Sequence, residues 1–377
     1  NSELENKSLM IFCMKPINQI EPWIDRKELK ELKRVVKSTF VSEHHINKEF
    51  EELIKDITKS PHAVSMTNGT AALYCALKAL GIGKGDEVIV PNLTFIASSN
   101  AVIFAGAKPV LCDVDKKSLC MSALEASKVL TPKTKAIMPV HLYGRSCDMD
   151  EICAFAKDNN LKIIEDAAQG TGVFYKNKHV GTFGDLGVLS FYANKTITCG
   201  EGGIILGKDK NLIDDCYKMK NHGRLSKGVF VHTDIGFNFS FTEMQAAVGV
   251  SQLKKLKKVI TKKDKIHKFY HDNIKNNLLE SIPVDNTIQP VHWFSSFLTD
   301  HKSKLKEYLS LNKIQSREFF YPLNKQPCYI ESDLVNTDVS FEISEKIFKR
   351  GISLPSAHNI TKRQLRYICK IINDFKV

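Results

Sequence analysis

The sequence predicts an α/β fold in which helices cover a mostly parallel central sheet, followed by a smaller α+β domain. Between about residues 60 and 210, short runs rich in Val and Ile alternate with segments of helical periodicity, which is the pattern of a parallel sheet buried on both faces. From about residue 250 the chain is Lys-rich and helical, and then mixed. We therefore expect an N-terminal segment and a large domain at residues 1–250, and a small domain at residues 251–377.

Six expected strands follow one another in the large domain. They are residues 86–91, 108–115, 135–144, 161–168, 187–193 and 202–207. Helical patterns separate the first four strands, whereas a short link joins the last two. Open α/β sheets bind ligands beyond the carboxyl ends of their strands, so functional side chains are expected there.

The bulk composition is that of a globular protein without a membrane span. Hydrophobic residues make up 43% and charged residues 25% of the chain, which is ordinary, and no apolar run approaches the roughly 20 residues needed to cross a bilayer. The N-terminal run NSELENKSLMIFCMKP lacks the apolar core of a signal peptide. The ten cysteines form no CxxC pair. We expect reduced thiols, a cytoplasmic protein and no membrane partner.

The formal charge of +12 raises an alternative function, that of a basic nucleic-acid-binding protein. Much of this charge lies in residues 253–268, where Leu253, Leu256 and Ile260 recur at helical spacing and lysines occupy the other face. A solvated helix face is the commoner reason for such a pattern, so we expect no nucleic-acid partner. A basic surface also attracts anionic small molecules such as nucleotide sugars.

Several residues stand where a planar, phosphorylated ligand would need them. Asn68-Gly69-Thr70 precedes a helix, where a glycine lets phosphate approach backbone N–H groups, although such residues also form ordinary helix caps. Phe95 begins another helix and has a ring that can cover a planar ligand, unless it belongs to the core. Ser190 has a hydroxyl to offer to a phosphate.

Asp166 and Lys195 are the charged candidates. Asp166, with Glu165 before it, ends the run LKIIEDAA; such a carboxylate can bind metal, act as a base, hold a protonated ring nitrogen or cap a helix. Lys195 lies between the apolar run LSFYA and a Gly-rich turn. A lysine that forms imines needs a neutral amine, and a partly buried apolar site lowers its pKa from the ordinary value of about 10.4. An ordinary surface lysine is the alternative.

Other catalytic templates are missing from the sequence. In GIGKGD, Gly85 stands where a P-loop needs Ser or Thr, and there is no HExxH, GxSxG or kinase signature. His267 and His271 share a helix face without a carboxylate to complete a metal site, so we expect no metal.

The candidate residues, taken in order, match what pyridoxal 5′-phosphate (PLP) requires. This cofactor needs a phosphate cup, a surface to stack on, a carboxylate that keeps its pyridine nitrogen protonated, and a Schiff-base lysine. A Gly-Thr pair, an aromatic residue, an acid at a strand end and a lysine 29 residues after that acid supply all four. The pattern predicts a PLP enzyme.

Five motifs make the chain similar to the DegT-type nucleotide-sugar aminotransferases, a branch of the fold-type I (aspartate-aminotransferase-like) PLP enzymes. They are NGTAALYCALKALGIGKGDEVIVPNLTFIASSNAV, PVHLYG, IIEDAAQ, SFYANKTITCGEGG and GFNFSFTEMQAAVG, and the resemblance spans nearly the whole chain. Within the family, PVHLYGRSCDMD, NKTITCGEGG and SREFFYPLNKQPCY are most similar to the perosamine synthases.

The resemblance assigns roles around the cofactor ring. Lys195 would bind PLP covalently and later move a proton between the cofactor and the sugar. Asp166 would form a salt bridge to the pyridinium, Gln169 would hydrogen-bond the ring hydroxyl, and Phe95 would stack on the ring.

The resemblance also implies a phosphate site and a homodimer. The backbone of Gly69 and Thr70 and the Ser190 hydroxyl would bind the phosphate. Asn238 would reach the same phosphate from the partner subunit, although it is otherwise an ordinary turn residue.

On the substrate side of the predicted site, the sequence offers three candidate residues and departs from the family pattern at two positions. Arg317, Tyr321 and His141 are candidates to contact the nucleotide sugar, and His141 has a structural role as the alternative. Two positions depart from the family pattern: Ser240 stands where Arg is usual, and Asn324 where His is expected. We therefore expect the contacts to an anionic substrate group and to the acceptor sugar to differ from those usual in the family.

The implied reaction is a ping-pong amino transfer. L-Glutamate would convert the cofactor to pyridoxamine 5′-phosphate, and the amine would pass to the 4-keto carbon of a nucleotide-linked 4-keto-6-deoxy sugar. GDP-4-keto-6-deoxymannose, giving GDP-perosamine, is the favoured acceptor, and UDP- or dTDP-4-keto-6-deoxyglucose, giving a viosamine-type sugar, is the alternative. Related dehydratases of the family carry His where Lys195 stands, so the lysine favours amino transfer. O-antigen or other polysaccharide biosynthesis is the expected context.

Overall fold

The computed structural model describes residues 15–226, 228–332, 334–336 and 339–377. Its largest sheet has the strand order β1-β9-β8-β5-β4-β2-β3. The strands are β1 (His62–Met66), β2 (Glu87–Pro91), β3 (Lys108–Cys112), β4 (Thr134–Ile137), β5 (Lys162–Asp166), β8 (Leu186–Ser190) and β9 (Gly203–Gly207). β9 pairs antiparallel with both of its neighbours, β1 and β8, and the other pairs in this sheet are parallel. The carboxyl ends of the parallel strands therefore lie at one edge.

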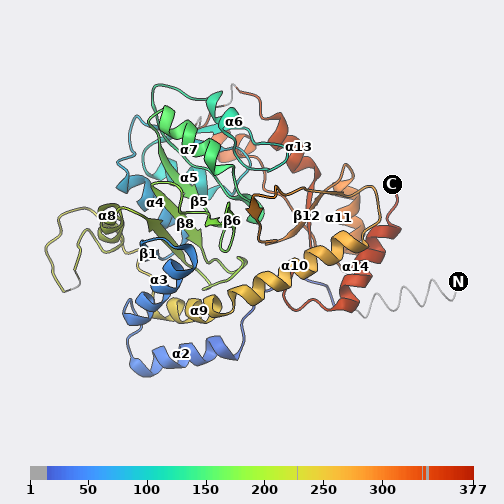
Figure 1. Cartoon of the computed structure of the whole chain (residues 1–377), viewed down its shortest axis with the longest axis horizontal. Coiled ribbons are helices and arrows are strands. Elements are labelled where there is room, and N and C mark those ends of the chain that lie inside the picture. The colour runs from blue at the N-terminus through green and yellow to red at the C-terminus, as the bar shows by residue number, and fades with distance from the viewer. Residues whose placement is uncertain (1–14, 227, 333, 337–338) are drawn as a thin grey trace.

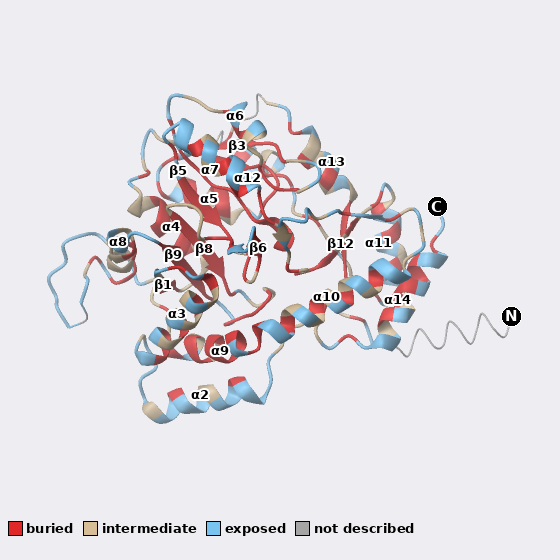
Figure 2. Ribbon diagram, in the orientation of Figure 1, coloured by how far each residue is buried: buried red, intermediate tan, exposed pale blue. Residues whose placement is uncertain are grey.

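Helices pack on both faces of this sheet and form two apolar cores (Figures 1 and 2). One core includes α4 (Gly69–Ala79), α5 (Ala97–Phe104) and α8 (Lys210–Lys220). The other includes α3 (His45–Thr58), α7 (Met149–Asp158) and α9 (Glu243–Lys254), with α2 (Arg26–Ser38) against α9 and α6 (Ala123–Ser127) beside α7. Because both faces are covered, Val88 and Ile89 on opposite faces of β2 are both fully buried, which accounts for the continuous apolar runs.

A second, antiparallel sheet lies in the C-terminal part, with the order β10-β12-β14-β13. Its strands are β10 (Glu280–Ser281), β12 (Ser295–Leu298), β13 (Arg317–Glu318) and β14 (Gly351–Leu354). The helices of this part are α10 (Leu256–Asn273), α11 (Lys302–Leu311), α12 (Pro327–Ile330), α13 (Glu342–Arg350) and α14 (Lys362–Asp374). A third apolar core joins α10, α11 and α14 to the sheet.

Short segments connect the two parts of the chain. β11 (Ile288–Gln289) pairs with β6 (Phe174–Tyr175), which also pairs with β7 (Lys178–His179). Ile17 forms a parallel bridge with Ile314 and belongs to the C-terminal core. The division into domains at residue 250 stays a prediction.

The six predicted strands are confirmed, and β1 is an addition to them. The Lys-rich segment is amphipathic as predicted, but it is interrupted, since α9 ends at Lys254 and α10 begins at Leu256. Within the described ranges, no helix has the length and apolar character that a membrane span requires. Residues 1–14 of the N-terminal run considered for a signal peptide lie outside the description.

Candidate active site

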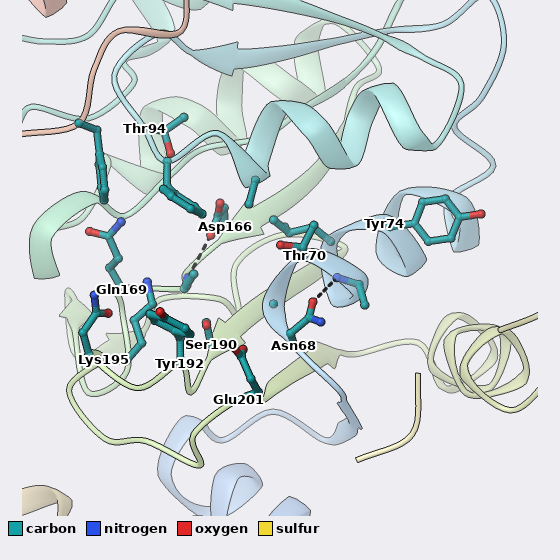
Figure 3. A pocket seen from close by; sticks show the side chains of 18 of the residues that line it. Asn68, Thr70, Tyr74, Thr94, Asp166, Gln169, Ser190, Tyr192, Lys195 and Glu201 are labelled. Atoms are coloured by element: carbon teal, nitrogen blue, oxygen red, sulfur yellow. Dashed lines mark hydrogen bonds between the residues drawn. The ribbon is translucent and has the colours of Figure 1, made fainter. Parts of the chain in front are cut away.

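A cavity of about 850 Å³ lies at the carboxyl ends of β5 and β8 and the N-terminus of α4 (Figure 3). Most of the predicted site residues line it, namely Gly69, Thr70, Phe95, Asp166, Gln169, Ser190, Lys195 and Arg317. His141, Asn238 and Tyr321 do not line it. The shared sheet edge therefore brings together residues that are far apart in the sequence.

Lys195 lies on the turn between β8 and β9 and lines the cavity (Figure 3). Its backbone N–H donates to the Tyr192 carbonyl at 2.9 Å. Burial lowers the pKa of the Lys195 amine to about 8; the negative charge of Asp166 opposes this shift and the positive charge of Arg317 adds to it. Roughly a tenth of the amine is therefore neutral at pH 7, against about one part in a few thousand for an ordinary lysine.

Asp166 is the last residue of β5, and its buried carboxylate is fixed by two hydrogen bonds. Oδ2 accepts from the Ser98 hydroxyl at 2.6 Å, and Oδ1 accepts from the Ala168 N–H at 3.1 Å. The Thr94 hydroxyl lies 3.0 Å from that of Ser98. Because the Ser98 proton is directed to Asp166, Thr94 is the donor in this second contact. The chain of hydroxyls holds the carboxylate in one orientation at the cavity wall.

Glu165, the preceding residue on β5, belongs to the opposite face of the sheet. Its carboxylate accepts from the N–H groups of Gly181, Phe183 and Gly184 at 2.6–2.8 Å and lies 3.0 Å from His141 Nε2. Burial raises the pKa of Glu165, but these hydrogen bonds and the nearby imidazole outweigh it, and the net pKa is lowered. The structure therefore places the predicted substrate residue His141 in a buried pair away from the cavity.

The N-terminus of α4 and the end of β8 form a narrow cradle. Asn68 caps the helix, and its Oδ1 accepts from the Ala71 N–H at 2.9 Å. The first N–H groups of a helix lack partners within it, so those of Gly69 and Thr70 are oriented to bind an anion. A Cβ atom on Gly69 would come within 3.1 Å of Ser190 Cβ and 3.3 Å of its Oγ. The space between α4 and Ser190 therefore depends on glycine.

Gln169 and Phe95 add a hydrogen-bond donor and an aromatic ring. Gln169 Oε1 accepts from the Tyr143 N–H at 2.7 Å, which leaves the amide NH₂ group to donate to a ligand. The Phe95 ring is 53% exposed and lies 5.7 Å from the Phe320 ring. It presents a large apolar surface that a planar ligand in the cavity would cover.

Arg317 brings a positive charge from the C-terminal sheet to the cavity. Its guanidinium lies 5.5 Å from the Phe294 ring centroid, and no salt bridge links it to a carboxylate within the described part of the chain. An unpaired guanidinium is suited to binding a carboxylate or phosphate.

Asn238 lies between two cavity residues but does not line the cavity itself. Phe237 and Phe239 pack on Tyr74, with ring centroids 5.6 and 6.4 Å away. Successive side chains of an extended segment point to opposite sides. The exposed Asn238 side chain therefore faces away from the cavity of its own subunit.

Two further sequence expectations fall outside the cavity. Tyr321 is 46% exposed and is not a lining residue. Asn324, the position that departs from the family pattern, is held by Asn92, to whose Oδ1 its N–H donates at 2.8 Å, and by Glu345, which accepts from its amide at 3.1 Å. The structure thus assigns Asn324 contacts within the protein.

Sequence reasoning missed Asn194, Trp293 and Phe320, all of which line the cavity. Asn194 precedes Lys195 within a recognised motif, so its position was an available signal. Phe320 also lies within a recognised motif, SREFFYPLNKQPCY, whereas no motif or strand-end pattern marks Trp293. Trp293 is one of only two tryptophans in the sequence, which was the one weak clue.

The mostly parallel sheet, with a lysine, an acid and a phosphate cradle at its edge, defines a fold-type I PLP-dependent transferase. The chain belongs to the DegT/DnrJ/EryC1/StrS aminotransferase family, whose sequence model matches residues 22–373. It is therefore a PLP-dependent aminotransferase. The predicted fold class, family and cofactor are confirmed.

Two relatives and one solved structure are similar to this chain over nearly their full length. The chain is 40% identical to the GDP-perosamine synthase of Escherichia coli O157:H7, covering 96% of this chain and 99% of the relative. It is 35% identical to the GDP-perosamine synthase of Vibrio cholerae, covering 94% and 98%. Among solved structures, DesV of S. venezuelae superposes with a TM-score of 0.89 at 27% identity, covering 96% and 98%.

The residues in the cavity fit PLP chemically. The free N–H groups at the start of α4 and the space beside Gly69 suit a phosphate. Asp166 offers a fixed carboxylate for a ring nitrogen, and Lys195 offers an amine that loses its proton readily.

Replacing Gly69 by alanine should weaken PLP binding about tenfold, or about 1.4 kcal/mol, because the added methyl group enters the phosphate cradle. Absorbance titration of the cofactor-free protein measures this. Gly83→Ala is the matched control, since its Cβ would meet only ordinary contacts at 3.5 Å and beyond, outside the cavity. Equal PLP affinity of the two variants would show that the phosphate binds elsewhere.

Proposed function

We propose that this enzyme transfers the amino group of L-glutamate to the 4-keto carbon of GDP-4-keto-6-deoxymannose and produces GDP-perosamine. The reaction type rests on one observation: Lys195, with a pKa lowered to about 8, lines the same cavity as the fixed carboxylate of Asp166. The choice of acceptor is supported by the similarity to GDP-perosamine synthases over nearly the whole chain. A cytoplasmic location and a role in polysaccharide biosynthesis are part of the same proposal.

The chain's own residues would divide the work around the cofactor. When bound, PLP supplies the electron sink through which an amino group leaves one carbon and joins another. Asp166 would keep the ring nitrogen protonated, Gln169 would donate to the ring hydroxyl, and Phe95 would cover the ring. Lys195 would hold the cofactor covalently and, when released, carry a proton on its Nζ. A pKa near neutrality suits a group that must both accept and donate this proton.

The rest of the cavity is proposed to bind the substrates. Arg317 brings an unpaired guanidinium to this space, and we assign it to the phosphates of the nucleotide sugar. The aromatic wall formed by Tyr74, Phe237 and Phe239 offers apolar surface on the α4 side of the cavity.

A homodimer would complete the site. Beside Asn238, the segment from Val229 to Phe237 exposes several apolar side chains, with Phe230 82% and Ile235 93% exposed. Such surface is typical of a segment covered by a partner. Because Asn238 faces away from its own cavity, we propose that it binds the cofactor phosphate of the partner subunit.

Hybrid dimers should test this arrangement directly. A dimer of one Lys195→Ala subunit and one Asn238→Asp subunit should regain about half the wild-type turnover if Asn238 acts on the partner, because one of its two sites then has both residues intact. Each homodimeric variant should be nearly inactive. The hybrid is isolated through two different affinity tags, and its glutamate-dependent activity is measured. Absence of recovery would place Asn238 in its own subunit's site or outside both.

The substrate is identified by supplying GDP-, UDP- and dTDP-linked 4-keto-6-deoxy sugars side by side with L-glutamate. We expect the highest kcat/KM with GDP-4-keto-6-deoxymannose. Preference for a UDP- or dTDP-linked sugar would replace perosamine by a viosamine-type product and leave the amino-transfer reaction in place. Amination of none of them would overturn the proposal.

A further inference from the structure

Trp293 connects the C-terminal part of the chain to the turn that carries Lys195. It lies just before β12, is only 1% exposed and lines the cavity. Its indole Nε1–H donates to the carbonyl of Asn194 at 2.6 Å. The centre of its ring is 4.7 Å from Lys195 Nζ. One side chain therefore contacts both the lysine amine and the backbone immediately before it.

The position of Trp293 is itself determined by several contacts. Its carbonyl accepts from the amine of Lys263, a buried residue of α10, at 2.9 Å. Its ring stacks on Phe294 at 4.0 Å and on Tyr143 at 6.4 Å between centroids. Tyr143 also gives its N–H to Gln169, another cavity residue. A side chain held in this way can fix the geometry of its neighbours.

We propose that Trp293 is a positioning residue for Lys195, acting through its indole N–H on the backbone before the lysine and through its ring face on the amine. The inference rests on the proposed role of Lys195 as the cofactor lysine.

The aromatic ring suits an amine that must change its protonation state. The negative face of an indole attracts an ammonium group but accepts no proton from it. It therefore stabilises the protonated amine in place while leaving the proton free for transfer. This attraction opposes the effect of burial, so weakening the ring face should lower the pKa of Lys195 further below its ordinary value.

Fluorinated tryptophan separates the ring's charge from its shape. The other tryptophan, Trp23, lies outside the cavity, so a Trp23→Phe background leaves Trp293 as the one labelled site. Incorporation of 5-fluoro- and then 5,7-difluorotryptophan should lower the pKa of Lys195 stepwise, by roughly 0.2–0.5 per fluorine. The pKa is read from the pH dependence of Lys195 acetylation in cofactor-free protein by peptide mass spectrometry. Exposed Lys257 is the internal reference and should not change. A flat series would overturn the ring contact.

Trp293→Phe tests the indole N–H, because phenylalanine keeps an aromatic face and loses the donor to Asn194. We expect kcat to fall about tenfold while KM for L-glutamate stays within about twofold, since the loss affects the alignment of Lys195. Unchanged kcat would overturn this half of the proposal. If the variant does not fold, incorporation of benzothienylalanine in the Trp23→Phe background tests the same bond, because this analogue keeps the fused ring and has no N–H to donate to Asn194; an unchanged kcat would again overturn this half of the proposal.

Borohydride reduction of the wild-type protein with PLP distinguishes failure of this inference from failure of the proposed function. If the cofactor is not fixed onto Lys195, the proposed function fails. If it is fixed but neither Trp293 experiment shows the expected change, only the role of Trp293 is overturned.

Discussion

Replacing Lys195 by alanine is expected to lower kcat for amino transfer by at least about 1,000-fold, because the cavity then lacks the group that we propose to bind the cofactor and move the proton. Lys195 is the only amine-bearing side chain among the described lining residues. Glutamate-dependent amination in the steady state measures the loss. The variant should stay folded, since the substitution removes a cation whose charged form burial disfavours.

Lys263 is a matched comparison within the same protein. Burial lowers its pKa to about 8 as well, but its amine donates to the Trp293 carbonyl and does not line the cavity. Borohydride reduction in the presence of PLP should therefore label Lys195 and leave Lys263 unlabelled, as read by peptide mass. Labelling of Lys263, or substantial turnover by Lys195→Ala, would contradict the role given to Lys195.

Asp166→Asn should lower kcat by about 100- to 1,000-fold, because a neutral amide cannot keep a ring nitrogen protonated. The fold should tolerate the change. The amide oxygen can still accept the hydrogen bond that the Ser98 hydroxyl gives to the carboxylate at 2.6 Å. Steady-state kinetics and thermal unfolding together measure the two effects.

Glu165→Gln is the matched control for Asp166→Asn, since Glu165 precedes Asp166 on the same strand. It should retain PLP affinity but lower the free energy of unfolding by about 3 kcal/mol, because the amide disrupts a buried set of hydrogen bonds to backbone N–H groups and His141.

The pH dependence of unfolding gives a second test of Glu165. Its folded-state pKa lies below the ordinary 4.5, so its stabilisation is present above pH 4.5 and is lost as pH falls through the folded pKa. The glutamine variant should lack this part of the acid dependence. Loss of PLP affinity in Glu165→Gln, or full activity of Asp166→Asn, would contradict the assignment of the two carboxylates to opposite faces.

The sequence allowed the strands to be predicted where burial on both faces demands continuous apolar runs, as in β2 and β8. β1 was not among the predicted strands, because the polar Ser65 interrupts its apolar run. This residue is fully buried, and its hydroxyl has two acceptors on α3 within hydrogen-bond distance, Asn47 Oδ1 at 2.6 Å and Glu51 Oε1 at 2.7 Å. The interruption between α9 and α10 also depends on a tertiary contact: Lys255 is drawn inward to the buried carboxylate of Glu28 at 2.6 Å.

In the candidate site, too, some residues are predictable from local sequence, whereas others depend on tertiary packing. Asp166 and Lys195 stand at the ends of recognisable strands, so topology alone predicts that they meet. Trp293 reaches the cavity because the C-terminal part packs against the large sheet, and no local sequence pattern predicts this packing. The location of His141 likewise depends on which face of β5 carries Glu165, which only the pairing of the strands determines.

The antiparallel course of β9 has a consequence for how such an enzyme changes over evolution. Ser190 and Gly203 are paired neighbours in the sheet, so the segment that carries Lys195 is tethered at both of its ends. The Ser190 side of the cradle and Lys195 thus belong to one loop that strand pairing closes, and the other side of the cradle is the N-terminus of α4. Arg317 and Trp293 come from the C-terminal part of the chain. If Arg317 binds the nucleotide sugar as proposed, a substitution there can change substrate choice while the loop that carries Lys195 stays constant.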